Sequence, residues 1–221
     1  MSTPQIQWSY SGLKDYQNCP RQYHEVKVLR NFAKKPTPQM TYGTQVHAAL
    51  EDYVRDGKPL AKNYQQYQRQ LDPLREMPGE KYPEHRMALT VDRVPCTFGA
   101  KDYWVRGIAD LLVVDGDMGF IVDYKTGSNR YPDPKQLQLM ALMAFAHFPD
   151  VVHIKAGLLF VVHEHFVTSE YNRDDVDVLW KDFEGTLERL RLSYANQAWQ
   201  PNPTPLCGWC PVSTCEFNKQ R

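Results

Sequence analysis

The chain has 221 residues, 42% of them hydrophobic, and it carries 26 basic and 26 acidic residues. This length and hydrophobic content suffice for one sizeable domain with a real core. No stretch approaches the roughly 18 to 20 apolar residues that a membrane span needs. The formal net charge of zero excludes the global basicity of many nucleic-acid binders, so any affinity for DNA would depend on a local basic groove.

The N-terminal part of the chain is predicted to be helical. Residues 11–32 form a first helix that is interrupted near Pro20, and residues 41–55 and 61–75 form two more. Basic side chains gather in the first of these segments and just after it, and a charge run of this kind is more often a solvated face than a binding site. The basic residues are Arg21, Lys27, Arg30, Lys34 and Lys35.

The helix at residues 41–55 combines an apolar stripe with a histidine. Val46, Leu50 and Tyr53 have the i, i+4, i+7 spacing of a buried stripe, and His47 flanks it. Glu51, four residues after the histidine, shares its face and would hold the imidazole. A lone histidine on a helix is more often structural than catalytic, so this segment alone identifies no site.

Three strands are predicted next, at residues 84–93, 103–114 and 120–124. The second and third are rich in apolar and β-branched residues, and Asp115-Gly116-Asp117 between them has the composition of a turn. A helix follows at residues 135–147, with Pro134 before it as an N-terminal signal. These segments predict a hairpin followed by a crossover helix.

The hairpin brings two carboxylates together. With Gly116-Asp117 as the two-residue loop, partner positions sum to 233 and Asp110 lies opposite Asp123. With Asp115-Gly116 as the loop, Asp110 is a diagonal neighbour of Asp123 on the same face. Lys125, two residues beyond Asp123, points to that face in either register.

Paired carboxylates beside a lysine suit metal-dependent phosphodiester hydrolysis. Cross-strand carboxylates repel unless a cation joins them, and hard oxygen ligands favour Mg²⁺ or Mn²⁺. A lysine at such a metal would orient or deprotonate the attacking water, or steady the charge on the phosphate. A solvated salt bridge between Asp123 and Lys125 explains the triplet equally well when it is taken alone.

The C-terminal part is predicted to add a strand at residues 151–162 and an amphipathic helix at residues 173–197. A proline-rich connector at residues 200–205 then leads to three closely spaced cysteines. The C-x₂-C spacing of Cys207 and Cys210, with Cys215 nearby and Cys19 far upstream, is typical of a zinc or an iron–sulfur site. The N-terminus lacks the features of a secretory signal, which makes a structural disulfide less favoured. Cys96 stands apart from this group.

Two segments of the hairpin are Gly107-Ile-Ala-Asp110 and Ile121-Val-Asp123-Tyr-Lys125-Thr-Gly127. Together they resemble the metal-binding core of the PD-(D/E)xK nuclease superfamily, specifically its RecB-like branch. Trp8-Ser-Tyr-Ser11 with Cys19-Pro-Arg21 resembles the N-terminal segment of that branch, and Gly43-Thr-Gln-Val-His47 its histidine motif. Lys135-Gln136-Leu-Gln-Leu-Met140 resembles its Q-x-x-x-Y helix, except that Met140 replaces the usual tyrosine. The resemblance therefore runs along most of the chain.

The resemblance implies roles for individual residues. His47, Asp110 and Asp123 would ligate Mg²⁺ or Mn²⁺, with the backbone carbonyl of Tyr124 as a further oxygen ligand. Lys125 would activate or position the water. Gln136 would orient Lys125 or the phosphate, and Gln138 is a second candidate if the register shifts. Glu84 occupies the place of the first acidic residue of the family and would orient water or a second metal.

The resemblance also implies the fold and a second metal centre. We expect an α/β protein with a restriction-endonuclease-like core sheet flanked by helices, in the order strand, strand, helix, strand. Residues 1–221 would form a single domain, in which segments 1–40 and 200–221 are joined by a cluster. In the family, four such cysteines hold a [4Fe–4S] cluster, so Cys19, Cys207, Cys210 and Cys215 would do so here, with zinc as the alternative.

The expected function is that of a metal-dependent DNA exonuclease in recombination, replication or repair, with a phage as one expected source. It would act in the cytoplasm on DNA with single-stranded character. A recombinase, helicase or integrase would be its partner, and no membrane is involved. Two alternatives stay open: a CRISPR adaptation nuclease that trims spacer precursors, and a non-catalytic DNA-binding subunit of a recombination complex. The intact Asp110, Asp123 and Lys125 argue against the last of these.

Overall fold

The computed structural model describes residues 6–219, and the chain divides into two compact units. Unit 1 combines the N-terminal segment up to Pro36 with the segment that begins at Trp180, and unit 2 comprises Thr37–Leu179. The single-domain interpretation stays a prediction. Within the described residues, none of the helices has the length and apolar character that a membrane crossing requires.

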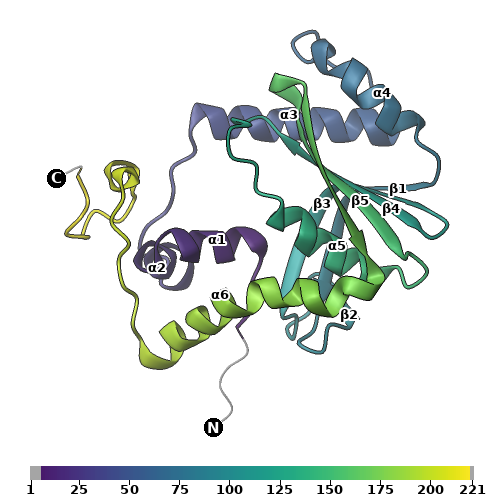
Figure 1. Ribbon diagram of the computed structural model, residues 1–221. Coiled ribbons are helices and arrows are strands. Elements are labelled where there is room, and N and C mark those ends of the chain that lie inside the picture. The colour runs from purple at the N-terminus through teal and green to yellow at the C-terminus, as the bar shows by residue number, and fades with distance from the viewer. Residues whose placement is uncertain (1–5, 220–221) are drawn as a thin grey trace. The chain divides into compact units, whose positions relative to one another are not determined.

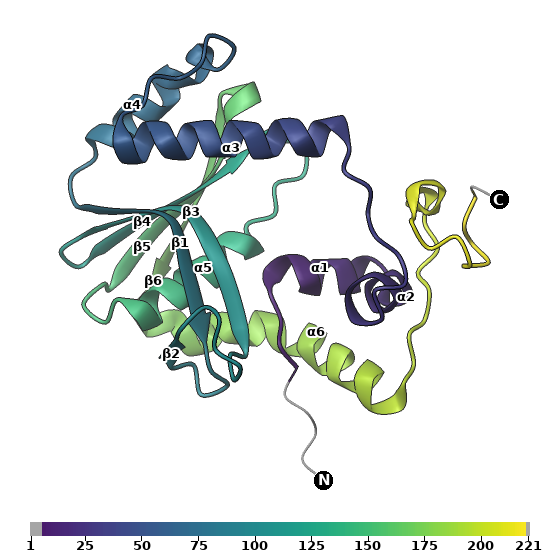
Figure 2. The ribbon, with the colours of Figure 1, turned by 180° about the vertical axis from the view of Figure 1, so that it is seen from behind.

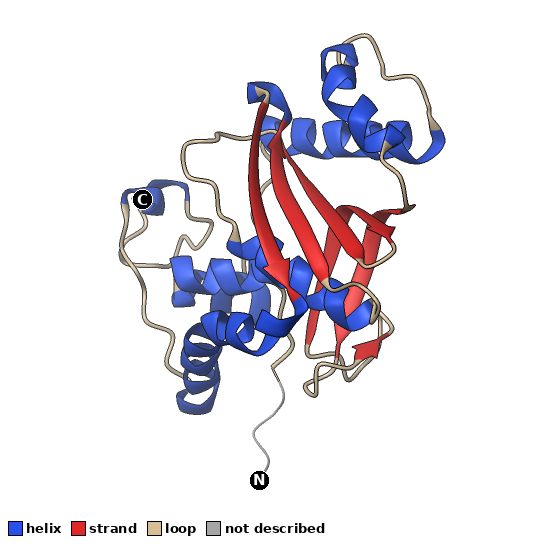
Figure 3. Ribbon diagram, turned by 45° about the vertical axis from the view of Figure 1, so that its right-hand side comes forward, coloured by secondary structure: helices blue, strands red, loops and turns tan. Residues whose placement is uncertain are grey.

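Unit 2 is built on a mixed six-stranded sheet with the order β2-β1-β3-β4-β5-β6 (Figure 3). Strands β4 and β5 run parallel and are joined through α5, and the other neighbouring strands are antiparallel. The expected α/β core and the order strand, strand, helix, strand are thereby confirmed. The elements that form it are β1 (Glu80–Leu89), β2 (Pro95–Cys96), β3 (Val105–Asp115), β4 (Met118–Lys125), α5 (Lys135–His147), β5 (His153–Phe160) and β6 (His165–Asn172).

The hairpin of β3 and β4 has the first of the two predicted registers. Leu111 pairs with Val122 and Asp115 with Met118, so partner positions sum to 233 and Gly116-Asp117 is the loop. Gly116 has a φ of 59°, a left-handed conformation that glycine adopts without steric cost. This register places Asp110 and Asp123 at the same level of the sheet, one step beyond the last bonded pair.

Two strands and several boundaries differ from the sequence-based expectations. Strand β1 begins at Glu80 and not at residue 84, and the helix predicted at residues 61–75 begins at Gln68. Strand β6 was not predicted, because it is an edge strand whose mostly exposed, polar residues give no clear apolar alternation. Strand β2 has only two residues. The last helix, α6 (Val176–Asn196), begins later than predicted because Arg173–Asp175 form a 3₁₀ turn.

Helices α3 (Pro38–Asp56) and α4 (Gln68–Glu76) cover one end of the sheet in both views of the ribbon (Figure 1, Figure 2). Thr37 caps α3 by accepting a hydrogen bond from the Met40 N–H at 3.2 Å, and Pro38 occupies its first turn. The predicted apolar stripe of α3 is buried, since Leu50 is 0% exposed and packs with residues of β3 and β4 in one hydrophobic cluster. This packing places the histidine of α3 beside Asp110, in the middle of β3.

Helix α5 covers the opposite face of the sheet. A side chain at Gly107 of β3 would meet Met140 of α5, because a Cβ there would lie 2.3 Å from the methionine Cε. Helix α5 is buried along most of its length, from Leu137 to Phe145. Helix α5 therefore leaves Gly107 no room for a side chain and lies close to the strands.

Unit 1 contains α1 (Tyr10–Asn18), α2 (Pro20–Tyr23), a π-helical turn (His24–Val28) and the part of α6 that begins at Trp180. The predicted break near Pro20 is confirmed, because Cys19 is extended with a φ of −163° between the first two helices. Trp199 packs against the rings of Tyr23, His24 and Tyr194. These aromatic contacts join the N-terminal helices to the segment that follows α6.

Candidate active site

Asp123 lies at the end of β4, almost fully buried at 4% exposure. Its Oδ1 accepts a hydrogen bond of 2.5 Å from Nε2 of Gln136 on α5, and its Oδ2 forms an ion pair of 2.5 Å with Nζ of Lys125. Lys125 Nζ also donates to Gln136 Oε1 at 3.0 Å. The three side chains form a closed network, in which the amide of Gln136 serves the carboxylate and the ammonium at once.

Asp110 is the second carboxylate of the site. Its Oδ2 accepts a hydrogen bond of 2.7 Å from the backbone N–H of Tyr124 and lies 3.3 Å from Nδ1 of His47. Bonded pairing between β3 and β4 stops one residue earlier, at Leu111 and Val122. The Asp110 side chain therefore takes a backbone N–H that the ladder leaves free.

The charges of the two carboxylates shift the pKa values around them. Burial raises the pKa of Asp123, and the charge of Asp110 raises it further, while Lys125 acts in the opposite direction and does not cancel the shift. Burial lowers the pKa of His47, but the hydrogen bond and charge of Asp110 outweigh it, so the net pKa of His47 is raised. The two carboxylates thus favour a cation between them.

Tyr124 contributes its backbone and not its ring to this face. The ring is 1% exposed and belongs to the hydrophobic cluster beneath α3, with His47 packed edge-on against it at a centroid distance of 6.0 Å. Neighbouring residues of a strand point to opposite faces, which separates the Tyr124 ring from Asp123 and Lys125.

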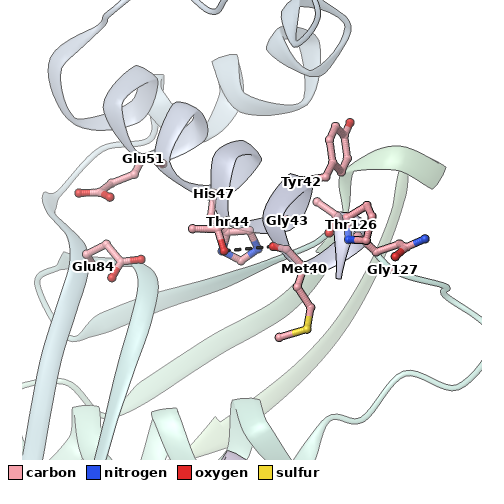
Figure 4. A pocket seen from close by; sticks show the side chains of 12 residues that line it. Met40, Tyr42, Gly43, Thr44, His47, Glu51, Glu84, Thr126 and Gly127 are labelled. Carbon is pink, nitrogen blue, oxygen red and sulfur yellow. Dashed lines mark hydrogen bonds between the residues drawn. The ribbon is translucent and has the colours of Figure 1, made fainter. Parts of the chain in front are cut away.

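Glu84 and His47 line a cavity of about 1050 Å³ between the N-terminal half of α3 and the end of β4 (Figure 4). Glu84 has a φ of 48°, so the strand bends out of its regular course at this residue. Burial, Asp110 and Glu51 raise the pKa of Glu84. The cavity is lined by Pro38, Gln39, Met40, Tyr42, Gly43, Thr44, His47, Ala48, Glu51, Glu84, Thr126 and Gly127.

The structure corrects the expected role of Glu51 and decides between the two candidate glutamines of α5. Glu51 does not hold His47, because it forms an ion pair with Arg55 one turn farther along α3, and Asp110 contacts the imidazole instead. Gln138, the second candidate on α5, donates to the carbonyl of Leu179 at 2.8 Å. Gln136 is the glutamine that contacts Asp123 and Lys125.

The cavity contains residues that sequence reasoning missed. Tyr42 and Met40 lie on the first turns of α3, and Thr126 and Gly127 follow directly after Lys125. The only signal for Thr126 and Gly127 was their position next to the D-x-K triplet. The family resemblance placed His47 at the site, but no residue pattern indicated that the first turns of α3 would line the cavity beside Thr126 and Gly127, since this depends on how the helix packs.

The donor chemistry of the site suits Mg²⁺ or Mn²⁺, because two carboxylates and one imidazole supply oxygen and nitrogen ligands around a buried, cation-seeking Asp123. As the side chains stand, Lys125 and the Tyr124 N–H occupy oxygens of the two carboxylates. Accordingly, no three His, Cys, Asp or Glu side chains among residues 6–219 form a ready-made metal group. A divalent cation would compete with Lys125 for Asp123.

Unit 1 contains a second, separate cavity. It has a volume of about 20 Å³, and Cys19, Cys207, Cys210 and Cys215 all lie on its wall. The first of these thiols accepts hydrogen bonds from the backbone N–H groups of Gln22 at 3.5 Å and Asn202 at 3.4 Å. Cys96, the remaining cysteine of the chain, lies in β2 of unit 2.

The thiols at the other side of this cavity have donors of the same kind. Cys207 accepts from the Thr204 N–H at 3.4 Å, and Cys210 from Nε2 of Gln22 at 3.3 Å. All four cysteines are free thiols. The four cysteines thus line one cavity, with N–H groups directed at three of the sulfurs, but among residues 6–219 no three of them are placed as a metal-binding group.

Comparisons with known proteins agree with the geometry of unit 2. The family model of the PD-(D/E)XK nuclease superfamily matches residues 7–215. A search of curated proteins finds no significant match. Among solved structures, a "Putative exonuclease" from Eubacterium rectale is similar, with a TM-score of 0.54 and 16% identity over 94% of this chain and 88% of the other.

A second solved structure, of the protein SSO0001, has a TM-score of 0.51 and 14% identity, covering 99% of this chain and 90% of that one. At such low identity, both likenesses show the fold alone. The family model spans the histidine of α3, the two carboxylates, Lys125 and Gln136, which the fold brings together. The chain belongs to the PD-(D/E)XK nuclease superfamily.

Proposed function

We propose that this nuclease is a Mg²⁺- or Mn²⁺-dependent deoxyribonuclease that acts as an exonuclease. The observation that carries the proposal is the network of Asp123, Lys125 and Gln136 next to the contact between Asp110 and His47. The fold likeness to a protein named an exonuclease supports action at DNA ends. Such an activity would serve recombination, replication or repair.

The residues of the chain have distinct roles in this proposal. His47, Asp110 and Asp123 would hold the metal, which when bound supplies Lewis-acid stabilisation of a phosphate and acidifies water. Gln136 fixes the Asp123 carboxylate and the Lys125 ammonium relative to each other through its amide. Nζ of Lys125 then activates or positions the attacking water and steadies charge on the scissile phosphate.

A cleavage assay tests this function. Linear single- and double-stranded DNA labelled at either end is incubated with Mg²⁺ or Mn²⁺ and with wild-type protein or Lys125→Ala. We expect stepwise degradation by the wild type and a rate lower by roughly 10²- to 10⁴-fold in the variant, the usual contribution of a positioned proton-transfer group. The label that is lost first reveals the polarity.

Lys155→Ala is the matched control, because Lys155 is an exposed lysine on β5 that pairs with Glu170. It should degrade DNA at the wild-type rate. Equal degradation by Lys125→Ala would refute the role of the network. A folded, metal-supplied wild type that cleaves no DNA would refute the nuclease proposal and favour a DNA-binding subunit.

We also propose that Cys19, Cys207, Cys210 and Cys215 hold a [4Fe–4S] cluster. Four thiols on one cavity provide the ligand number that such a cluster requires, and N–H groups directed at sulfur are typical of its surroundings. Zinc would use the same four thiolates. Metal analysis and the colour of the purified protein distinguish an iron–sulfur cluster from zinc.

A further inference from the structure

A pair of arginines in unit 2 stands out by its surroundings. The guanidinium of Arg106 on β3 lies over the rings of Phe98, at 5.2 Å, and Tyr103, at 4.7 Å, and that of Arg86 on β1 lies over Phe98 at 5.6 Å. Neither arginine forms an ion pair within residues 6–219. Two positive charges are therefore fixed by one shared ring, with no carboxylate of the described residues at ion-pair distance, although the charge of Arg86 acts at longer range on Glu84.

The basic residues near the N-terminus contrast with this pair. Lys34 and Lys27 both pair with Asp15, at 2.7 and 3.8 Å, and Arg21 pairs with Glu216 at 3.2 Å. Much of the positive charge in that cluster is thus neutralised within unit 1. In a chain of zero net charge, unpaired arginines held in a defined position are the better candidates for a phosphate contact.

The position of the pair connects it to the active site. Gly107 faces α5, as does His85, whose ring contacts that of His147 on α5. Because side chains alternate along a strand, Arg106 and Arg86 point to the face turned away from α5. Helix α3 covers that same face at the other end of the sheet, and its His47 reaches Asp110 there.

Along their strands, the two arginines lie only a few nucleotide lengths from the candidate site. Arg86 is two residues from Glu84, which lines the cavity beside His47, so about 7 Å of strand separates them. Arg106 is four residues from Asp110, or about 13 Å along β3. A strand whose scissile phosphate lies at Asp110 would bring its next few phosphates past both guanidinium groups.

We propose that Arg86 and Arg106 bind successive phosphates of the DNA strand that leads away from the catalytic residues. This inference rests on the proposed function, because it takes DNA as the ligand and the site at Asp110 as the point of cleavage. The planar guanidinium presents fixed donors to phosphate oxygens. Phe98 and Tyr103 hold those donors in place before the strand arrives.

The experiment compares wild type with the double variant Arg86→Gln/Arg106→Gln. Affinity for a labelled single-stranded 20-mer is measured by fluorescence anisotropy at several salt concentrations, with Ca²⁺ in place of Mg²⁺. Loss of two phosphate contacts should reduce the magnitude of the slope of the log association constant against log salt concentration by about 1.4. It should also weaken binding by roughly 10- to 30-fold near 0.1 M salt. An unchanged slope and affinity would overturn the proposal.

A small substrate separates strand binding from chemistry. Thymidine 5′-(p-nitrophenyl phosphate) contains a cleavable diester and no strand that reaches Arg106, so its hydrolysis with Mn²⁺ should be the same in wild type and variant. The control variant Arg69→Gln/Lys155→Gln removes two exposed charges of unit 2 that pair with Glu164 and Glu170. It should bind the 20-mer like wild type, and an equal loss there would overturn the proposal.

Failure of the two proposals can be told apart. A wild type that cleaves neither DNA nor thymidine 5′-(p-nitrophenyl phosphate) contradicts the proposed function. The anisotropy measurement then still decides whether the arginines bind DNA, because it needs no cleavage. A measurement on the wild type alone covers the case in which the glutamine variant fails to fold. Phenylglyoxal modification, read by mass spectrometry, should be slowed at Arg86 and Arg106 by the 20-mer, and equal modification with and without DNA would refute the contact.

Discussion

At the scale of single residues, the site depends on an acid that is buried beside another acid. Asp123 is held by Gln136 and Lys125, and Asp110 by His47 and the backbone of Tyr124. Each carboxylate therefore has its own set of donors, and the two sets come from different elements. The amide of Gln136 is the link between α5 and the end of β4.

Gln136→Ala should lower the rate of DNA cleavage by about 10- to 100-fold, the usual effect of losing a group that orients a metal ligand. Without the amide, Asp123 and Lys125 lose a shared partner and adopt a wider range of positions. The measurement is kcat with Mn²⁺, together with a thermal melt that should be close to wild type. Gln66→Ala, at an exposed glutamine before α4, is the control, and an unaltered kcat in Gln136→Ala would contradict the prediction.

At the scale of elements, α3 has two tasks that follow from its helical spacing. Its apolar stripe packs on β3 and β4, and His47, one residue after Val46, is directed to the edge of that contact. Thr37, Pro38 and Gly57 define where the helix starts and ends. The position of the imidazole is thus a consequence of how the stripe is buried.

Leu50→Ala should destabilise the protein by about 2–5 kcal/mol, because Leu50 is fully buried and its loss leaves a cavity in the cluster beneath α3. Urea unfolding followed by circular dichroism measures this change in the free energy of unfolding. Val178→Ala, at a residue that is 63% exposed on α6, should change it by less than about 0.5 kcal/mol. A similar change in the free energy of unfolding in both variants would show that burial of the apolar stripe does not contribute the expected stability.

At the scale of the whole molecule, chemistry and the cysteines lie in different units. Unit 2 contains the sheet and the candidate catalytic residues, whereas Cys19 and the three C-terminal cysteines belong to unit 1. The cavity between these thiols joins segments almost 190 residues apart in the chain. A metal cluster there would tie the N-terminal helices to the C-terminal tail.

Cys19→Ser should therefore lose bound iron, brown colour and part of the thermal stability. Protein purified without oxygen is examined by visible absorbance, iron and sulfide analysis, and thermal melting. Cys96→Ser is the matched control, because this thiol lies in unit 2 outside the cavity, and it should keep its iron. Colourless wild-type protein with one equivalent of zinc would refute the iron–sulfur assignment. The four cysteines would then be assigned as zinc ligands.

The sequence alone determined the elements with strong periodicity and the residues that pair locally. Helix α5, the hairpin that brings Asp110 and Asp123 to one face, and the buried stripe of α3 all follow from short-range patterns of apolar residues, turn residues and proline. The sequence left two registers of that hairpin open, and the structure has the one that sets Asp110 opposite Asp123. Strand β6 escaped prediction because an exposed edge strand needs no such pattern.

Only the tertiary structure decided which distant side chains meet. It placed Asp110, and not Glu51, at His47, chose Gln136 over Gln138, and set Arg86 and Arg106 over one ring. Contacts of this kind depend on how helices pack across a twisted sheet and on which strands become neighbours. Local spacing contains no information about either, since it describes only what lies within a few residues of each position.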